Sequence, residues 1–172
     1  MNNSFIPLIF KEKIFQLIRW LKAFLFLFLS IGLFLSVFTF NINDNSFLTS
    51  TSNLSSNALG IIGSYIASFL IYSFGFMSYL IIFFLLVNSV AAFTNKSLNF
   101  FFIRLFLFLL SIIFLPQVFF YLNWNLTYFE NIHAWGEIAY NLYNIHQIEW
   151  ISYILSLIGV ILFLLSQNIF KI

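Results

Sequence analysis

Side chains that could do acid–base or metal chemistry gather in one stretch near the C-terminal end of this chain. Two histidines, His133 and His146, lie there among Glu130, Glu137 and Glu149. The histidines do not form a His-x-x-x-His pair, the spacing that puts two metal ligands on one helix face. Cysteine is absent, so no thiolate ligand or nucleophile is available. We therefore expect water-exposed histidines at a membrane interface, with no metal, no cofactor and no catalytic residue.

The motifs of ATP and nucleic-acid chemistry are also missing from the sequence. No Gly-x-x-x-x-Gly-Lys-Ser/Thr phosphate loop occurs, and the few basic residues form no patch large enough for DNA. Arg104 lies at the start of an apolar stretch, where its long side chain can snorkel to lipid headgroups beside Lys96. We expect these two residues to signal topology. No charged residue lies deep within a predicted span, which argues against an ion-coupled transporter.

The composition requires a lipid environment for most of the chain. Of the 172 residues, 62% are hydrophobic and only 7% are charged, a balance that would leave a soluble domain with large exposed apolar patches. A bilayer core of about 30 Å needs roughly 20 apolar residues per helix, and several uncharged stretches approach that length. The sequence therefore predicts an all-α integral membrane protein.

Four transmembrane helices are predicted within this class. They cover about residues 20–40, 76–93, 101–122 and 151–170. Pro116 falls inside the third span and predicts a kink, because proline removes one helix hydrogen bond and clashes with the preceding turn.

Two longer polar loops, residues 41–58 and 123–150, separate the spans. The apolar stretch after the first loop is too long for one untilted helix, and Gly75 lies near its middle. We expect residues 59–74 to form a short interfacial helix before the second span. The second loop carries Trp and Tyr among polar and acidic residues, which is typical of the headgroup level and predicts a second interfacial helix.

The first 21 residues are predicted to be a cytoplasmic amphipathic segment ahead of a four-helix membrane domain, residues 22–172. Charged residues of this segment alternate with apolar residues at helical spacing. The apolar run that follows is a full span long and has no small-residue cleavage site, so we interpret it as a retained helix and not as a signal peptide.

The positions of the basic residues predict the orientation of the chain. With four spans, the N-terminus, the loop after the second span and the C-terminus share one side of the membrane. All the basic residues fall on or near that side: Lys11, Lys13, Arg19, Lys22, Lys96, Arg104 and Lys171. Because cytoplasmic loops carry the excess of Lys and Arg, we predict an N-in/C-in arrangement.

Small residues recur along the first interfacial helix. Gly60, Ser64 and Ser68 are spaced four residues apart, with Gly63 and Ala67 beside them. Such a narrow face allows another helix to approach closely, so we expect it to be a packing surface.

A set of motifs precedes and includes this small-residue helix. An Asp-x-Ser loop is followed by Asn-x-x-Gly-x-x-Gly and then by a Phe-Gly step into the second span, at Asp44, Ser46, Asn57, Gly60, Gly63, Phe74 and Gly75. A weaker second match is His-Ala-Trp-Gly-Glu at 133–137, where Gly136 precedes a helix. This order resembles the N-terminal four-helix (4TM) membrane region of the FtsK/SpoIIIE family of DNA translocases, over nearly the whole chain.

The resemblance implies a non-catalytic anchor in the bacterial inner membrane, at the division septum, acting in cell division and chromosome segregation. The family's ATPase motor would lie on a C-terminal region that these residues do not contain. The implied partners are the lipid bilayer, further copies of the chain and other septal membrane proteins, without direct binding of nucleic acid or ATP.

Two other functions remain open at this point. Short, charge-poor membrane chains are frequent among small transporters and respiratory-complex subunits, and this is the main alternative. A lipid-modifying enzyme would need catalytic polar residues at one membrane face, for which His133, Glu130 and Glu137 are the candidates.

Overall fold

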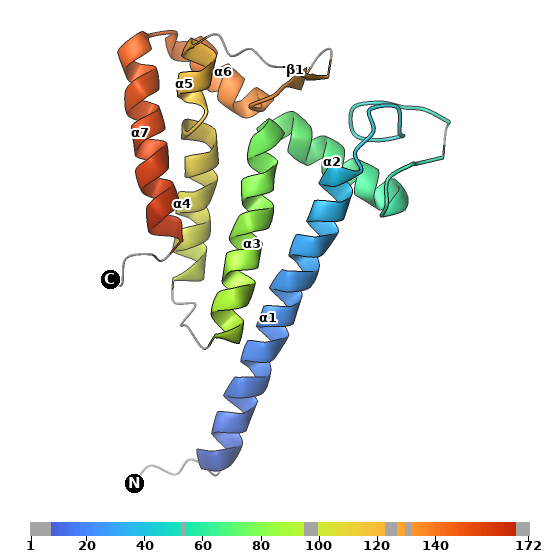
Figure 1. Ribbon diagram of the computed structural model, residues 1–172, viewed down its shortest axis with the longest axis vertical. Helices are drawn as coiled ribbons and strands as arrows, with labels where there is room; N and C mark the ends of the chain where they lie inside the picture. The colour runs from blue at the N-terminus through green and yellow to red at the C-terminus, as the bar shows by residue number, and fades with distance from the viewer. Residues whose placement is uncertain (1–7, 53, 95–99, 123–126, 130–131, 168–172) are drawn as a thin grey trace.

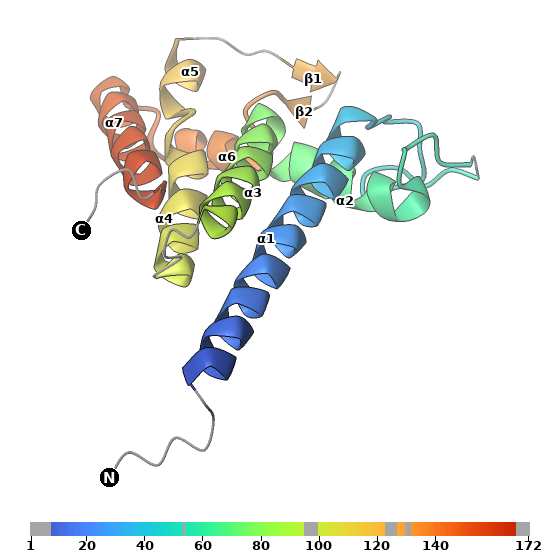
Figure 2. The same ribbon diagram turned by 60° about the horizontal axis from the view of Figure 1, so that its bottom comes forward.

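The computed structural model describes residues 8–52, 54–94, 100–122, 127–129 and 132–167. Four helical stretches in these residues are long and apolar enough to cross a membrane: Phe10–Phe38, Gly60–Phe93, Phe101–Tyr121 and Glu149–Ser166. The predicted all-helical fold with four spans is thereby confirmed. The spans lie side by side in the order α7, α4, α3, α1, as Figures 1 and 2 show.

The first span belongs to one long helix, α1 (Leu8–Phe38). The sequence predicted a cytoplasmic amphipathic segment up to residue 21. The helix runs through residue 21 without a break, because the sequence there contains no proline or glycine that would end it, and the position of this segment outside the membrane stays a prediction. Helix α1 packs along α3 (Ser78–Phe93). Two serines bridge these helices: Ser30 Oγ donates to the Ile82 carbonyl at 3.1 Å, and Ser89 Oγ donates to the Ala23 carbonyl at 2.9 Å.

The long apolar stretch after the first loop is divided as the sequence predicted. Helix α2 (Gly60–Phe74) lies across the end of the bundle, and a single turn of 3₁₀-helix, η1 (Gly75–Met77), leads into α3 (Figure 1). The direction changes at Gly75, whose φ of +54° lies in the left-handed region that glycine adopts without steric cost.

The third span is interrupted where proline was expected to kink it. Helix α4 (Phe101–Phe114) ends before Pro116, and a short helix α5 (Gln117–Tyr121) continues after it. Helix α7 (Glu149–Ser166) packs against this break, where Ser156 Oγ donates to the Leu115 carbonyl at 2.9 Å. The serine therefore satisfies a carbonyl at the end of α4.

The connection between α5 and α7 contains the second helix that the sequence predicted in the loops, α6 (Glu137–His146), whose place at the membrane interface stays a prediction. A short antiparallel hairpin of β1 (Thr127–Phe129) and β2 (Ile132–His133) precedes it, and the sequence did not predict this hairpin. Helix α2, the hairpin and α6 all lie at one end of the bundle, which we call the loop end (Figure 1). Helix α4 begins, and α3 and α7 end, towards the opposite end.

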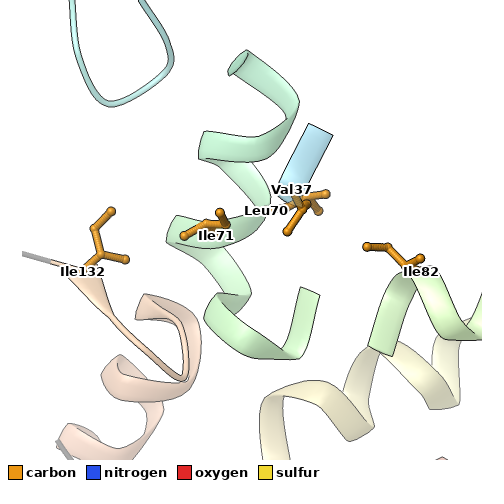
Figure 3. Packing of buried hydrophobic residues seen from close by; sticks show 5 residues of the cluster. All are labelled: Val37, Leu70, Ile71, Ile82 and Ile132. Carbon is orange, nitrogen blue, oxygen red and sulfur yellow. The ribbon is translucent and has the colours of Figure 1, made fainter. Parts of the chain in front are cut away.

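Two clusters of buried side chains join the elements. Val37, Leu70, Ile71, Ile82 and Ile132 connect α1, α2, α3 and β2 at the loop end (Figure 3). A second cluster connects α3 with α4, where the rings of Phe84 and Phe108 stack at 4.5 Å between centroids. The second cluster therefore holds the α1–α3 half of the chain against the α4–α7 half.

Candidate functional site at the loop end

The loop between α1 and α2 folds around the carboxylate of Asp44, which is only 3% exposed. Its Oδ1 accepts hydrogen bonds from the backbone N–H and the Oγ of Ser56, both at 2.9 Å. Its Oδ2 accepts from the Asn57 N–H at 3.1 Å, Ser55 Oγ at 3.2 Å and Ser64 Oγ at 3.4 Å. We call Asp44, Ser55, Ser56, Asn57 and Ser64 the Asp44 cage. Both carboxylate oxygens are satisfied by the chain itself, so the cage is a structural unit.

The charged form of Asp44 is stabilised by this arrangement. Burial alone would raise the pKa of Asp44, but the hydrogen bonds from Ser56, Ser55 and Asn57 outweigh it and hold the pKa below its usual value of 3.8. The cage is therefore built around a carboxylate and not around a carboxylic acid.

The second residue of the Asp-x-Ser motif shapes the turn after Asp44. The Ser46 N–H donates to the Thr49 carbonyl at 2.8 Å, and Thr49 Oγ1 donates to the Asp44 carbonyl at 2.6 Å. This turn is attached to α2 because the Phe47 N–H donates to Ser68 Oγ at 3.1 Å. Thr49 was not among the residues singled out in the sequence.

Asn57 connects the cage to the end of α1 and the start of α2. Its Nδ2 donates to the carbonyls of Ser36 at 2.8 Å and Thr39 at 3.3 Å, two acceptors that the helix end leaves free. Its Oδ1 accepts from the Leu59 N–H at 3.1 Å. A Cβ at Gly63 would overlap this amide, with Asn57 Cγ only 2.8 Å away. The asparagine and the second glycine of the motif are thus one packing unit.

The predicted small-residue face of α2 is occupied within the chain. Its residues Gly63, Ser64, Ala67 and Ser68 are buried. Ser36 Oγ of α1 donates to the Gly63 carbonyl at 2.6 Å, while Ser64 and Ser68 contact the Asp44 cage and the following turn. Gly60 begins the helix with φ of +61°, and a Cβ there would meet open space.

The two glycine motifs, far apart in the sequence, meet at the loop end. The Phe76 N–H donates to the Ala134 carbonyl at 2.7 Å. A Cβ on Gly75 would lie 2.7 Å from the Gly136 nitrogen, and a Cβ on Gly136 would lie 2.6 Å from the carbonyl carbon of Phe74. Both glycines have positive φ, +54° and +86°. This glycine contact joins the two halves of the chain through their backbones.

The histidines are half-buried and engaged in local contacts. His133 stacks on Tyr140 with 3.7 Å between ring centroids, and its Nε2 lies 3.9 Å from Glu137 Oε1. His146 pairs with the Leu142 carbonyl at 2.8 Å and with Ser152 Oγ at 3.1 Å. Among the residues that the structure describes, no three His, Cys, Asp or Glu side chains come together as a metal site would require.

The predicted topology residues lie away from the loop end where the structure describes them. Lys11, Lys13 and Lys22 are exposed on α1, and Arg19 is half-buried. Arg104 is buried, and its Nε donates to the Ser166 carbonyl at 2.8 Å. Lys96 and Lys171 lie outside the described residues. The N-in/C-in orientation stays a prediction.

Two residues at the break in the third span were not predicted. Gln117 is fully buried, and its Nε2 donates to the carbonyls of Ala139 at 3.0 Å and Ile113 at 3.1 Å, tying α6 to α5. Gly159 of α7 lies so close to the break that a Cβ would stand 2.6 Å from the Leu115 nitrogen. An amide directly after a proline in an apolar span was the available signal for Gln117.

The four spans and the folded loop end define a multi-pass membrane protein. The chain matches the family model of the 4TM region of DNA translocase FtsK/SpoIIIE over residues 16–165, and it belongs to this family of membrane domains. The match covers most of the chain and confirms the resemblance read from the Asp44-to-Gly75 motifs. No curated protein and no solved structure matches the chain.

Proposed function

We propose that this chain is the membrane anchor of an FtsK-like DNA translocase that acts in cell division and chromosome segregation. The observation that supports the proposal is the family match over residues 16–165, together with the use of the family's loop and glycine motifs to build one rigid loop end. An anchor needs a fixed shape more than a reactive site. The polar groups of the Asp44 cage form hydrogen bonds with one another, which stabilises the fold of the loop.

The anchor is proposed to be non-catalytic, with ATP hydrolysis carried out by a motor elsewhere in the translocase. Donors of the chain surround both oxygens of the buried Asp44 carboxylate, which supports a structural role for it. The chain would therefore contribute position and assembly, and the motor would contribute the chemistry.

The proposed location is the bacterial inner membrane at the division septum, with both termini in the cytoplasm. The loop end would then face the periplasm and contact further copies of the chain and other septal membrane proteins. Leu54, which is 95% exposed, and the exposed ring of Phe47 offer apolar side chains for such contacts on an otherwise polar loop.

Septal localisation of a fluorescent fusion in the native host tests this proposal. We expect the wild-type fusion to concentrate at the septum and Asp44→Ala to lose that concentration while remaining in the membrane. Asn43→Ala is the matched control, because Asn43 is exposed in the same loop and its side chain is outside the cage. A wild-type fusion spread evenly over the membrane would contradict the proposed role. An Asp44→Ala fusion that still concentrates at the septum would contradict the proposal that the loop end makes the septal contacts.

A further inference from the structure

A cavity of about 320 Å³ opens at the end of the bundle opposite the loop end. One wall consists of aliphatic and aromatic side chains of α3, including Leu86 and Val90, and its polar end is formed by Arg104 and Gln167. We call this cavity the Arg104 groove. Val90 is 58% exposed, so the groove is open along the exposed side of α3. Its volume is within the range of about 300 to 1,000 Å³ that small-molecule sites occupy.

The polar end of the groove contains unsatisfied groups. Arg104 is 6% exposed, and although its Nε donates to the Ser166 carbonyl, its Nη1 is buried without a hydrogen-bond partner among the described residues. Gln167 is 9% exposed, and its Oε1 is likewise without a partner there. Arg104 and Gln167 therefore line the same cavity, and each has one buried polar atom that lacks a hydrogen-bond partner among the described residues. Such groups are costly unless a ligand or water completes them.

Among the residues that the structure describes, no carboxylate side chain meets the charge of Arg104. Of the described acidic residues, Glu12 lies near the start of α1, Asp44 is enclosed in its cage, and Glu137 and Glu149 lie in the first turns of α6 and α7. No ion pair of Arg104 occurs within the described residues. Because an unpaired charge beside a bilayer is expensive, the counter-charge has to come from outside these side chains.

We propose that the Arg104 groove binds an anionic phospholipid. The phosphate would lie against the Arg104 guanidinium, whose planar fork matches phosphate oxygens, and an acyl chain would follow the apolar wall formed by Leu86 and Val90. Gln167 Oε1 is buried here, and after rotation of its side chain it would accept a hydrogen bond from a headgroup hydroxyl, which favours a glycerol headgroup. Arg104 lies in the first turn of α4, and Gln167 directly follows α7, so both stand at span ends where headgroups lie. The proposal is independent of the role in cell division.

Native mass spectrometry of the 172-residue chain released from detergent micelles tests the proposal. The probes are phosphatidylglycerol and phosphatidylcholine with identical acyl chains, offered together. One basic residue near the membrane surface corresponds to about a fivefold preference for an anionic lipid, and we expect at least this ratio for the wild type. In Arg104→Gln the ratio falls to about one. In Lys13→Gln, which removes an exposed charge from α1, it stays within about twofold of wild type.

A second variant separates loss of binding from loss of folding. Val90→Trp keeps Arg104 and places an indole from an exposed position into the groove, so we expect retention of phosphatidylglycerol to fall while circular dichroism is unchanged. If Arg104→Gln fails to fold, reduced retention of phosphatidylglycerol in Val90→Trp, with the ratio moving towards one, supports the proposal. Unchanged retention in that variant overturns it.

The source of the phosphate is tested in the same spectra by adding inorganic phosphate. A phosphate adduct that disappears in Arg104→Gln, with an unaltered lipid ratio, would show a free-ion site and overturn the lipid proposal. A change from dimer to monomer in Arg104→Gln with unaltered phosphatidylglycerol retention would assign the counter-charge to a second copy and overturn it as well.

Discussion

Replacement of Asp44 by alanine removes the acceptor around which the first loop folds. Two of the donors to its carboxylate are backbone N–H groups, those of Ser56 and Asn57. Ser56 is exposed, so its N–H can turn to water, whereas Asn57 is 5% exposed and its N–H would be left without an acceptor. A buried donor left unsatisfied costs about 1–3 kcal/mol, and the serine hydroxyl donors can rotate to other acceptors and add little. We therefore expect Asp44→Ala to lower the free energy of unfolding by about 1–3 kcal/mol.

The loss is measured by titrating the chain with SDS in mixed micelles and following the near-ultraviolet circular dichroism of its aromatic residues. Asn43→Ala serves as the control, because an exposed side chain in the same loop should change the free energy by no more than about 0.5 kcal/mol. If Asp44→Ala unfolds within about 0.5 kcal/mol of wild type, the carboxylate is not the centre of the loop and the reasoning is refuted.

Three further predictions follow from the same contacts. Because the pKa of Asp44 is lowered from 3.8, its stabilisation is complete above that pH and is lost as the pH falls through the lowered value; a pH series of unfolding should show this loss in wild type and not in Asp44→Ala. Gly75→Ala should lower the free energy of unfolding by at least about 1–2 kcal/mol because of the positive φ at this position. In the control Gly32→Ala the new Cβ would have no neighbour nearer than 3.9 Å, so its free energy of unfolding should stay within about 1 kcal/mol of wild type. Equal unfolding midpoints of the two variants in SDS would contradict this prediction. Since the chain has no cysteine, a membrane-impermeant maleimide on intact cells should label Leu54→Cys and spare Lys13→Cys until the cells are permeabilised, and the reverse pattern would contradict the N-in/C-in orientation.

The helices and their order could be predicted because the signals are local. An apolar run too long for one span, with Gly75 near its middle, predicted the division between α2 and α3, and Pro116 predicted the interruption of the third span. Periodicity alone could not predict whether the chain changes direction at residue 21. An amphipathic segment and an apolar segment can form one continuous helix when no residue between them ends it, as they do in α1.

The pairing of the motif residues was beyond sequence reasoning. The resemblance singled out Asp44, Asn57 and Gly63, yet the loop contains many Ser, Thr and Asn side chains of equal hydrogen-bonding capacity, and the chosen donors to Asp44 lie 11 to 20 residues away. The contact between Gly75 and Gly136 is more distant still and depends on how the two halves pack. The hairpin was missed because strands of two or three residues have no measurable periodicity.

Two buried residues of the spans show the same limit. Gln117 and Gly159 are defined by the carbonyls and backbone that reach them from other helices, and neither belongs to a motif with fixed spacing. Such residues make close contacts between the helices of this chain.

The DNA sequence that follows the codon for Ile172 tests the central claim most directly. The account predicts a linker and a phosphate-loop ATPase, either in the same reading frame or as the next gene. A neighbouring operon for an unrelated transporter or respiratory complex, with no such ATPase, would contradict the proposal that this membrane domain anchors a DNA translocase.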